Sequence, residues 1–174
     1  MNQRLATTAL LLLAAGATAF LWLRPDPLER EIRRVRDRLL ALASDASFSE
    51  KDPPLKRLGY PARVVPYFAN PTGLHIDRFN ADQLVTREEL EQGTAALRAG
   101  QRGLQIEFLD IQVRLDNPQS TNAEAYLTSR IYFTGDSDYW VQEFRLQLVK
   151  PADTWLVNDL ATVRRSEERR VGEE

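Results

Sequence analysis

The chain has 174 residues, 43% of them hydrophobic and 28% charged, which suits one ordinary domain with an appendage. Its 23 basic and 25 acidic side chains give a net charge of −2, which excludes the basic excess of a dedicated nucleic-acid-binding protein. With no Cys and one His, the sequence also excludes disulfide frameworks, thiol nucleophiles and multi-His metal centres. We predict neither a cofactor nor a metal site.

The run from Leu5 to Leu23 contains no charged residue. As a helix it would reach about 28 Å, close to the roughly 30 Å thickness of a bilayer core. Arg4 and Arg24 flank the run, and Trp22 lies where an interfacial aromatic is common. We therefore predict that residues 1–27 form an uncleaved signal anchor with one transmembrane helix.

Two other interpretations of this segment stay open. Ala17-Thr18-Ala19 has the spacing of small residues found at signal-peptidase sites, and the segment could instead be a buried helix. The Arg residues between positions 24 and 38, counted alone, would keep the following domain in the cytoplasm. Because acidic residues alternate with them, we expect an inner-membrane protein with a periplasmic domain.

A helix begins directly after the anchor. Asp26 is a suitable N-cap, Pro27 occupies N1 and Glu29 occupies N3. One apolar stripe follows, at Leu28, Ile32, Val35, Leu39 and Leu42. This spacing predicts a core-facing helix to about Ala43.

The next segment, residues 44–72, contains five prolines and cannot form a long helix. We predict short helical turns at 54–58 and 62–68, and short strands at 74–79 and 83–85. Thr86-Arg87-Glu88-Glu89 forms a capping box that begins a helix running to about Arg98 and ending at Gly100.

From residue 104 the apolar residues alternate with period two. This pattern predicts long antiparallel strands at 104–115, 123–134, 139–149 and 155–164. In the first of them Leu109 is expected on one face with Ile111, Val113 and Leu115. In the second, Leu127 and Ser129 are expected inside and Tyr126 and Arg130 outside. The domain is expected to cover residues 28–165, with a charged flexible tail at 166–174.

The order of these elements resembles the nuclear transport factor 2-like superfamily, the cystatin-like cone that includes ketosteroid isomerases and polyketide cyclase-like proteins. The residues that carry the resemblance are Tyr67-Phe68-Ala69-Asn70-Pro71, Thr86-Arg87-Glu88-Glu89-Leu90 and Trp155-Leu156-Val157. The family usually has Gly where this chain has Thr86. The resemblance implies an α+β fold, with N-terminal helices packed in a curled antiparallel sheet.

The resemblance also implies a pocket at the wide end of the cone, frequent dimerisation through the sheet, and highly variable function. The isomerases of this superfamily use a pocket carboxylate as base, often with a Tyr of the first helix as donor. This chain has no Tyr or His between Leu28 and Ser44, so that donor is missing. We assign no catalytic residue.

The candidate pocket residues are Asp159, Gln142, Ser129, Trp140 and Asp77. Asp159 alternates with Trp155 and Val157, so it is expected to point into the cone, where it could act as a base. Alternatively the faces are shifted by one residue, Leu160 points inward and Asp159 is solvated. Gln142 and Ser129 would orient a ligand, or else satisfy each other or a buried water.

Two further groups have a structural interpretation beside the functional one. Asp77 is expected to share a strand face with His75. The two residues could form part of a site, or they could simply be exposed residues of a strand. Charged residues on the outer faces of neighbouring strands predict cross-strand pairs, or a partner surface where Tyr126, Tyr132 and Tyr139 lie among them.

These patterns favour a membrane-tethered, non-catalytic module of the cell envelope, which binds a partner protein or a small apolar ligand. One alternative is an acid–base isomerase or dehydratase using Asp159 or Asp77. Another is a dimeric scaffold of an envelope complex. The partners we expect are the membrane, through Leu5–Leu23, a second copy through the sheet and an envelope protein, but no nucleic acid.

Overall fold

The computed structural model describes residues 26–135 and 138–163. The predicted anchor, Leu5–Leu23, and the predicted tail, 166–174, lie outside the described residues. Within the described ranges, no helix is both long enough and apolar enough to cross a membrane.

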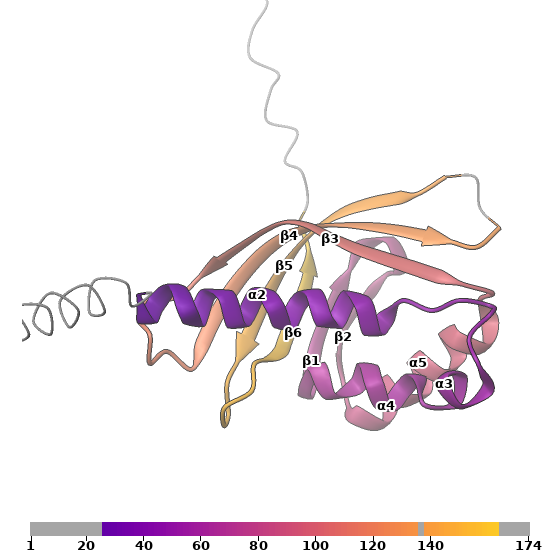
Figure 1. The fold of residues 1–174 in the computed structure, drawn as a ribbon, viewed down its shortest axis with the longest axis horizontal. Helices are drawn as coiled ribbons and strands as arrows, with labels where there is room; N and C mark the ends of the chain where they lie inside the picture. Colours follow the sequence, from indigo (N-terminus) through magenta and orange to yellow (C-terminus); the bar gives the residue numbers. More distant parts are fainter. Residues whose placement is uncertain (1–25, 136–137, 164–174) are drawn as a thin grey trace, which may run out of the picture.

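The described residues form one curled sheet with the helices inside the curl (Figure 1). The elements in chain order are α2 (Pro27–Ala46), α3 (Pro54–Leu58), α4 (Tyr60–Val64), the 3-10 turn η1 (Val65–Tyr67), β1 (Phe68–Ile76), the 3-10 turn η2 (Asp77–Phe79), β2 (Ala81–Val85), α5 (Arg87–Gly100), β3 (Leu104–Arg114), β4 (Asn122–Phe133), β5 (Trp140–Val149) and β6 (Leu156–Thr162). The strand order is β2-β1-β6-β5-β4-β3. All pairs are antiparallel except β1 with β6. The predicted α+β class is confirmed.

Helix α2 begins as its sequence predicts and ends one turn later than expected. The Asp26 side chain accepts a hydrogen bond from the Leu28 amide at 2.8 Å. At the other end, the Ser47 hydroxyl donates to the Ala43 carbonyl at 2.7 Å and accepts from the Ile106 amide at 2.9 Å. The helix end is thereby joined to β3, the strand against which α2 packs.

The interior of the curl is filled by large side chains. Buried residues from α2, α4 and the inner sheet face form one cluster that includes Leu39, Tyr60, Phe144 and Leu146. The Tyr60 ring is 1% exposed, and its hydroxyl donates to the Ala46 carbonyl at 2.8 Å. Burial raises the pKa of Tyr60 to about 12. The hydroxyl is therefore neutral and serves the packing of α4 on α2.

Two β-bulges change which residues face the interior. In β3 the register shifts between Leu109 and Gln112, and Asp110 has a φ of 51°. Phe108 and Ile111 consequently both pack on the core, whereas Leu109 lies opposite Thr128 on the outer face. The prediction that Leu109 shares a face with Ile111 was wrong, because strict alternation assumes an unbroken ladder.

The second bulge lies in β6, at Asn158. Val157 pairs with Leu148 and Leu160 pairs with Leu146, so both apolar residues of β6 face the core. Two residues, Asn158 and Asp159, lie between Val157 and Leu160, whereas in a regular strand one residue lies between neighbours on the same face. The alternation predicted for β6 from Trp155 onward therefore holds to Val157 and inverts after Asn158.

Among residues 26–135 and 138–163, one acidic residue, Glu31, is buried. Glu31 of α2 accepts hydrogen bonds from Lys150 Nζ at 3.2 Å and Trp155 Nε1 at 3.4 Å, and pairs with Arg34 at 2.5 Å. Burial opposes the charged form, but the hydrogen bond and charge of Lys150 outweigh it, so the pKa of Glu31 is lowered. The ion pair ties the start of α2 to the connection between β5 and β6.

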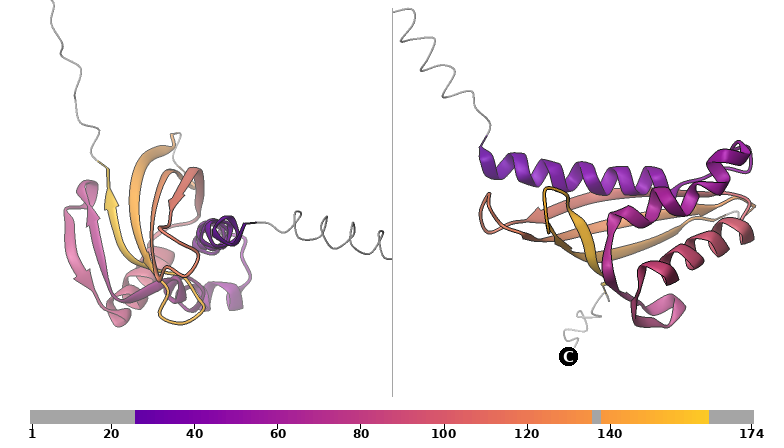
Figure 2. Two further views of the ribbon diagram at one scale, coloured as in Figure 1. Left: turned by 90° about the vertical axis from the view of Figure 1, so that its left-hand side faces the viewer. Right: turned by 90° about the horizontal axis from the view of Figure 1, so that it is seen from below.

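The two sides of the sheet differ completely. Figure 2 shows α2, α4 and α5 on the concave side, and among the described residues no helix covers the convex side, which we call the outer sheet face. In β4, Ala123, Ala125, Leu127 and Ser129 are buried, and the residues between them are not. The predicted alternation of β4 is confirmed.

We expect the core to depend on Leu146, which is fully buried opposite Leu160. Leu146→Ala should lower the free energy of unfolding by about 2–5 kcal/mol, because it leaves a cavity under the helices. The matched control is Leu55→Ala on α3, where the side chain is 84% exposed and the change should stay within about 0.5 kcal/mol. Chemical denaturation of both variants tests this, and equal losses would contradict the described core.

Candidate functional site

The titratable cluster on the outer sheet face is centred on His75. Its Nδ1 lies 2.5 Å from Asp82 Oδ1, and its Nε2 lies 3.1 Å from Asp159 Oδ2. The three side chains come from the neighbouring strands β1, β2 and β6. We call this group the His75 cluster.

Strand register accounts for the cluster. The β1–β2 pairing places His75 directly opposite Asp82, and the parallel β1–β6 pairing places Asp159 opposite Gly73. A Cβ on Gly73 would lie 2.4 Å from Asp159 Oδ2. Because Gly73 has no side chain, the Asp159 carboxylate can lie across β1 and reach the imidazole.

The electrostatics of the cluster favour the imidazolium form of His75. The hydrogen bond to Asp82 is the main cause that raises the pKa of His75; burial opposes it, and the charge of Asp159 adds to it. The imidazole is 43% exposed, so solvent screens these charges. A protonated ring can donate to both carboxylates at once and so links three strands.

The same geometry limits the chemistry of the cluster. Both ring nitrogens already contact a carboxylate, and the carboxylates lie on opposite sides of the ring. In the part of the chain that the structure describes, no group of three or more His, Asp or Glu side chains could hold a metal ion. The arrangement is suited to an ion-pair bridge that responds to pH.

Asp159 lies on the outer sheet face and not inside the cone. It pairs with the exposed Gln147, whereas the next residue, Leu160, packs on the core. The bulge at Asn158 is the physical reason, because it inverts the alternation that places Asp159 with Trp155 and Val157. The carboxylate contacts His75, a contact that the sequence did not suggest.

Three of the other predicted pocket residues lie at one end of β4 and β5. Ser129 is 1% exposed, and its hydroxyl has no hydrogen-bond partner among the described residues. Gln142 is opposite Ser129 in register, but its Nε2 donates to the Glu143 carbonyl at 3.1 Å. Trp140 packs on the core and meets Phe144 edge-on, with ring centroids 6.4 Å apart. Ser129 and Gln142 thus share a register position without bonding to each other.

Asp77 does not share a strand face with His75. It begins the turn η2, directly after β1 ends at Ile76, and its side chain is exposed. Its backbone amide donates to the Thr162 hydroxyl at 3.3 Å, which fixes the turn against β6. Asp77 therefore belongs to the turn after β1, whereas His75 belongs to the strand itself.

The other half of the outer sheet face is rich in tyrosine and arginine. Arg130 pairs with Glu107 at 3.4 Å across β3 and β4, and its guanidinium lies 5.3 Å from the ring centroid of Tyr139. Tyr132 and Tyr139 are neighbours, with ring centroids 5.5 Å apart. Tyr139 is 55% exposed and Val141 is 48% exposed. These side chains and the His75 cluster lie on the same face of the sheet, on β3 to β5 and on β2, β1 and β6 respectively.

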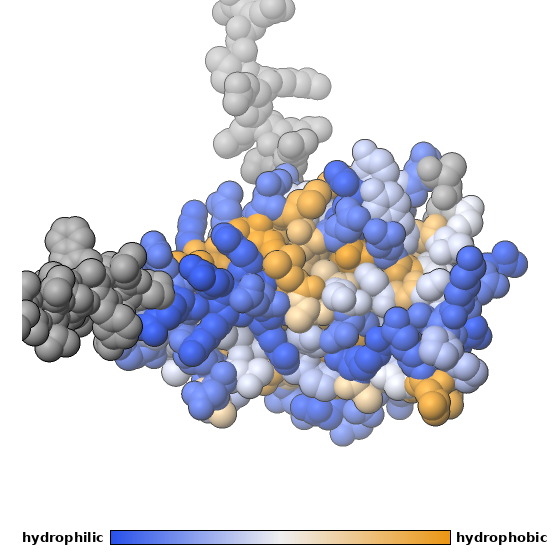
Figure 3. Space-filling model, in the orientation of Figure 1, coloured by the Kyte–Doolittle hydropathy of each residue, from blue (hydrophilic) through white to orange (hydrophobic). Residues whose placement is uncertain are grey.

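A separate groove lies between α2 and β3. It is lined by Arg36, Leu40, Phe108, Asp110, Ile111 and Gln112, and its volume is about 470 Å³. Arg36 Nη2 donates to the Ile111 carbonyl at 3.2 Å at its side. Figure 3 shows apolar side chains gathered above α2, whose own exposed side is strongly hydrophilic. Leu40, Phe108 and Ile111 give this groove an apolar lining beside the charged groups of Arg36 and Asp110.

The sequence did not identify Asp82 as part of a site. The available indication was its place in a short strand after β1, where a hairpin with His75 as the opposite residue was one of several possible registers. Register in such a short strand follows from tertiary pairing, so the residue pattern could not select it.

No protein-family model matches the sequence, and no curated protein sequence matches it. Solved structures do match the fold. A proposed scytalone dehydratase from Novosphingobium aromaticivorans superposes with a TM-score of 0.60 at 12% identity, covering 79% of this chain and 87% of that chain. A nuclear transport factor 2-like protein of unknown function from Pseudomonas putida gives a TM-score of 0.57 at 9% identity, covering 74% and 82%.

A third similar structure is a protein of unknown function with a cystatin-like fold from Nostoc punctiforme. Its TM-score is 0.55 at 13% identity, with 76% of this chain and 90% of that chain covered. At these identities the likeness concerns the fold alone. The fold is that of the nuclear transport factor 2-like, cystatin-like cone, as the order of elements in the sequence predicts.

Because His75 is the single His of the chain, its titration can be followed without assignment ambiguity. We expect NMR to give a pKa above the ordinary value of 6.5, and Asp159→Asn to lower it toward that value. The control Asp153→Asn changes an exposed carboxylate ahead of β6 and should leave it unchanged. An equal pKa in the parent and Asp159→Asn would contradict the bridge.

The bridge formed by His75 also predicts how the stability of the protein changes with pH. A pKa raised by folding stabilises the protein below the unfolded-state pKa, and this contribution is lost as pH rises through the folded-state pKa. The parent chain should therefore exceed His75→Gln in stability more at about pH 5.5 than at about pH 8.5. Urea denaturation at the two pH values measures the difference, and the opposite order would contradict the assignment.

Proposed function

We propose that this chain is a membrane-tethered, non-catalytic nuclear transport factor 2-like module whose outer sheet face binds another protein in the cell envelope. A second copy of the chain is the simplest such partner. The observation that carries the proposal is the open outer sheet face, which gathers exposed aromatic, arginine and carboxylate side chains on one surface.

The interior supports a non-catalytic role. The carboxylates expected as bases, Asp159 and Asp77, lie outside the apolar cluster in the described residues. The acid that is buried, Glu31, is held by Lys150 and Trp155 and thus serves as a structural ion pair. Acid–base catalysis needs a titratable group facing a bound substrate, and the residues that line the groove between α2 and β3 include none of these three groups.

The composition of the outer sheet face supports protein binding. Tyrosine and arginine are enriched in protein interfaces because each combines a large contact area with directed polar groups. Here Tyr139 and Val141 are exposed beside Arg130, and Leu84 is 70% exposed at the far edge, on β2. The guanidinium of Arg130 and the ring of Tyr139 already lie in contact, so they need little reordering on binding.

The tether rests on the sequence. The uncharged run Leu5–Leu23 is long enough to span a bilayer, and α2 begins four residues after it. A domain held this close to a membrane meets its partners at a high effective concentration. A moderate affinity at the outer sheet face would therefore suffice for an envelope complex.

We expect the expressed full chain to remain in the membrane pellet after extraction with alkaline carbonate and to be released by detergent. A variant with Leu12→Arg and Leu13→Arg should move to the soluble fraction, because charges at the helix centre oppose insertion. Replacing Leu55 and Leu58, two exposed residues of α3, by Arg is the matched control. A carbonate-soluble parent chain would overturn the tether.

We expect the detergent-solubilised chain to self-associate in sedimentation equilibrium, and Val141→Asp to weaken that association at least about tenfold, because it buries a charge in the interface. Leu55→Asp, which adds the same charge on α3, should have no effect. If the parent chain is monomeric, photo-crosslinking from position 141 in membranes tests whether another protein binds the outer sheet face. If no protein is captured there either, the outer sheet face is not a binding surface.

A further inference from the structure

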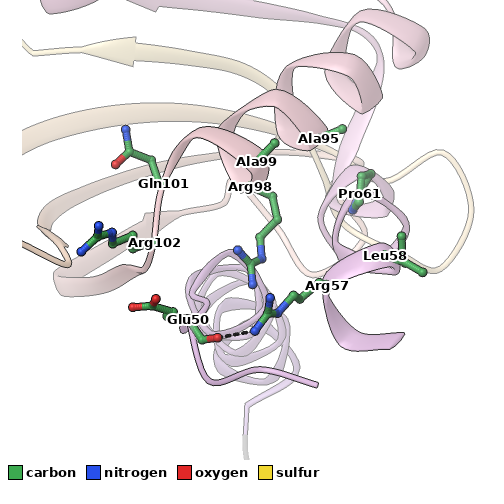
Figure 4. Close-up of a pocket in the computed structure, with 9 residues that line it drawn as sticks. All are labelled: Glu50, Arg57, Leu58, Pro61, Ala95, Arg98, Ala99, Gln101 and Arg102. Carbon is green, nitrogen blue, oxygen red and sulfur yellow. Dashed lines mark hydrogen bonds between the residues drawn. The ribbon is translucent and has the colours of Figure 1, made fainter. Parts of the chain in front are cut away.

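A cavity of about 480 Å³ lies at the end of the cone where α3, α4 and α5 meet (Figure 4). It is lined by Glu50, Arg57, Leu58, Pro61, Ala95, Arg98, Ala99, Gln101 and Arg102. The residues that line the cavity include none of those named on the outer sheet face, and α3, which contributes Arg57 and Leu58, lies beyond the C-terminal end of α2 (Figure 1). Its role is therefore separate from the proposed protein binding.

The lining carries three arginines and one carboxylate. In Figure 4 the guanidinium groups of Arg57 and Arg98 point toward each other, whereas the carboxylate of Glu50 points away from them. None of Arg57, Arg98 and Arg102 forms an ion pair among the described residues. Like charges brought together in this way favour a bound anion.

The hydrogen bonds of these arginines leave their charge uncompensated. Arg57 donates from Nε to the Asp52 carbonyl at 2.7 Å and from Nη2 to the Glu50 carbonyl. Arg98 donates to the Ser49 carbonyl at 3.2 Å, while its Nε is buried without a hydrogen-bond partner. The acceptors are neutral carbonyl groups, which position the guanidiniums but do not neutralise them.

The carboxylate of Asp52, whose charge interacts with Arg98, is already engaged by other groups. It accepts hydrogen bonds from the Ser49 amide at 2.9 Å and from Lys56 Nζ at 3.0 Å. The Ser49 amide is the main cause that lowers the pKa of Asp52; Lys56 adds to this, and Arg98 contributes through its charge. Lys56 pairs with Asp52, so these two charges cancel. The three arginines of the cavity and the single carboxylate of Glu50 then leave a net positive charge.

The rest of the lining is apolar. Leu58 and Pro61 form one wall, and Ala95 and Ala99 of α5 form the other. Leu58 is 81% exposed, so an apolar group at the rim would cover side-chain surface that now faces solvent. Apolar walls with a few converging polar groups are typical of small-molecule sites.

We infer that this cavity binds a small organic anion, an organic phosphate or carboxylate. Its charged oxygens would meet those terminal Nη donors of Arg57 and Arg98 that do not bind the loop carbonyls, with Arg102 at the edge. Its apolar part would contact Leu58 and the alanines of α5. Helix α2 has 20 residues, so its far end at Pro27 is about 30 Å away. We take the anion to be a dissolved molecule and not a membrane headgroup, a choice that rests on the tether proposed above.

Isothermal titration calorimetry of the full chain in a neutral detergent tests the inference, with phenyl phosphate as the probe. We expect phenyl phosphate to bind more tightly than inorganic phosphate, which lacks the apolar part, and benzyl alcohol, which lacks the charge, to give no binding. Dihexanoyl phosphatidic acid, a short-chain lipid with a phosphate headgroup, distinguishes a lipid headgroup from a dissolved anion as the ligand. Tighter binding of this lipid than of phenyl phosphate would overturn the assignment to a dissolved molecule.

Two variants locate the binding without removing a hydrogen bond from the loop. Ala99→Glu places a carboxylate on the exposed side of α5 and should weaken phenyl phosphate binding at least about tenfold. Arg102→Gln should weaken it about threefold to tenfold. The matched control Arg87→Gln removes the same charge from the other end of α5 and should change the affinity less than about twofold.

Absence of heat with phenyl phosphate at millimolar concentration, in a chain whose circular dichroism shows it folded, would overturn the inference. So would equal affinities of the parent and Ala99→Glu. Neither result would bear on the outer sheet face, whose association is measured with a different variant.

Discussion

The curl of the sheet is the constraint on which the rest of the structure depends, and β-bulges in β3 and β6 contribute to it. The bulges at Asp110 and Asn158 each add one residue to a strand, which bends the strand and increases its twist. The bent sheet can then wrap α2 and bury Leu146 and Val157 against it. A flat sheet of the same strands could not wrap around the helix in this way.

The same bulges distribute the charged groups between the two faces. After Asn158 the side chains of β6 exchange faces, which brings Leu160 inside and Asp159 outside. Glu31 is a charged residue that stays buried, and its ion pair with Lys150 compensates for the cost of that burial. The interior is thereby left to packing, and ionisable chemistry is moved to the outer sheet face and to the cavity beside α5.

The two candidate surfaces are held by different parts of the fold. The outer sheet face is formed mainly by side chains of hydrogen-bonded strands, and His75 adds a bridge across β2, β1 and β6. The cavity depends on a loop, residues 47–53, whose carbonyls are tied to Arg57 and Arg98. A protein partner suits a broad face, and a small anion suits a cavity formed by side chains from short helices.

The sequence alone determined the features that depend on neighbouring residues: the caps of α2 and α5, the stripe that buries Val35 and Leu39, the alternation in β4, and from their order the α+β class. Only the tertiary structure decided the strand register. The parallel pairing of β1 with β6 brings Gly73 beside Asp159, far apart in the chain, and the bulges override local alternation. Register and bulges both depend on packing between strands that are far apart in the chain, so a local residue pattern cannot predict them.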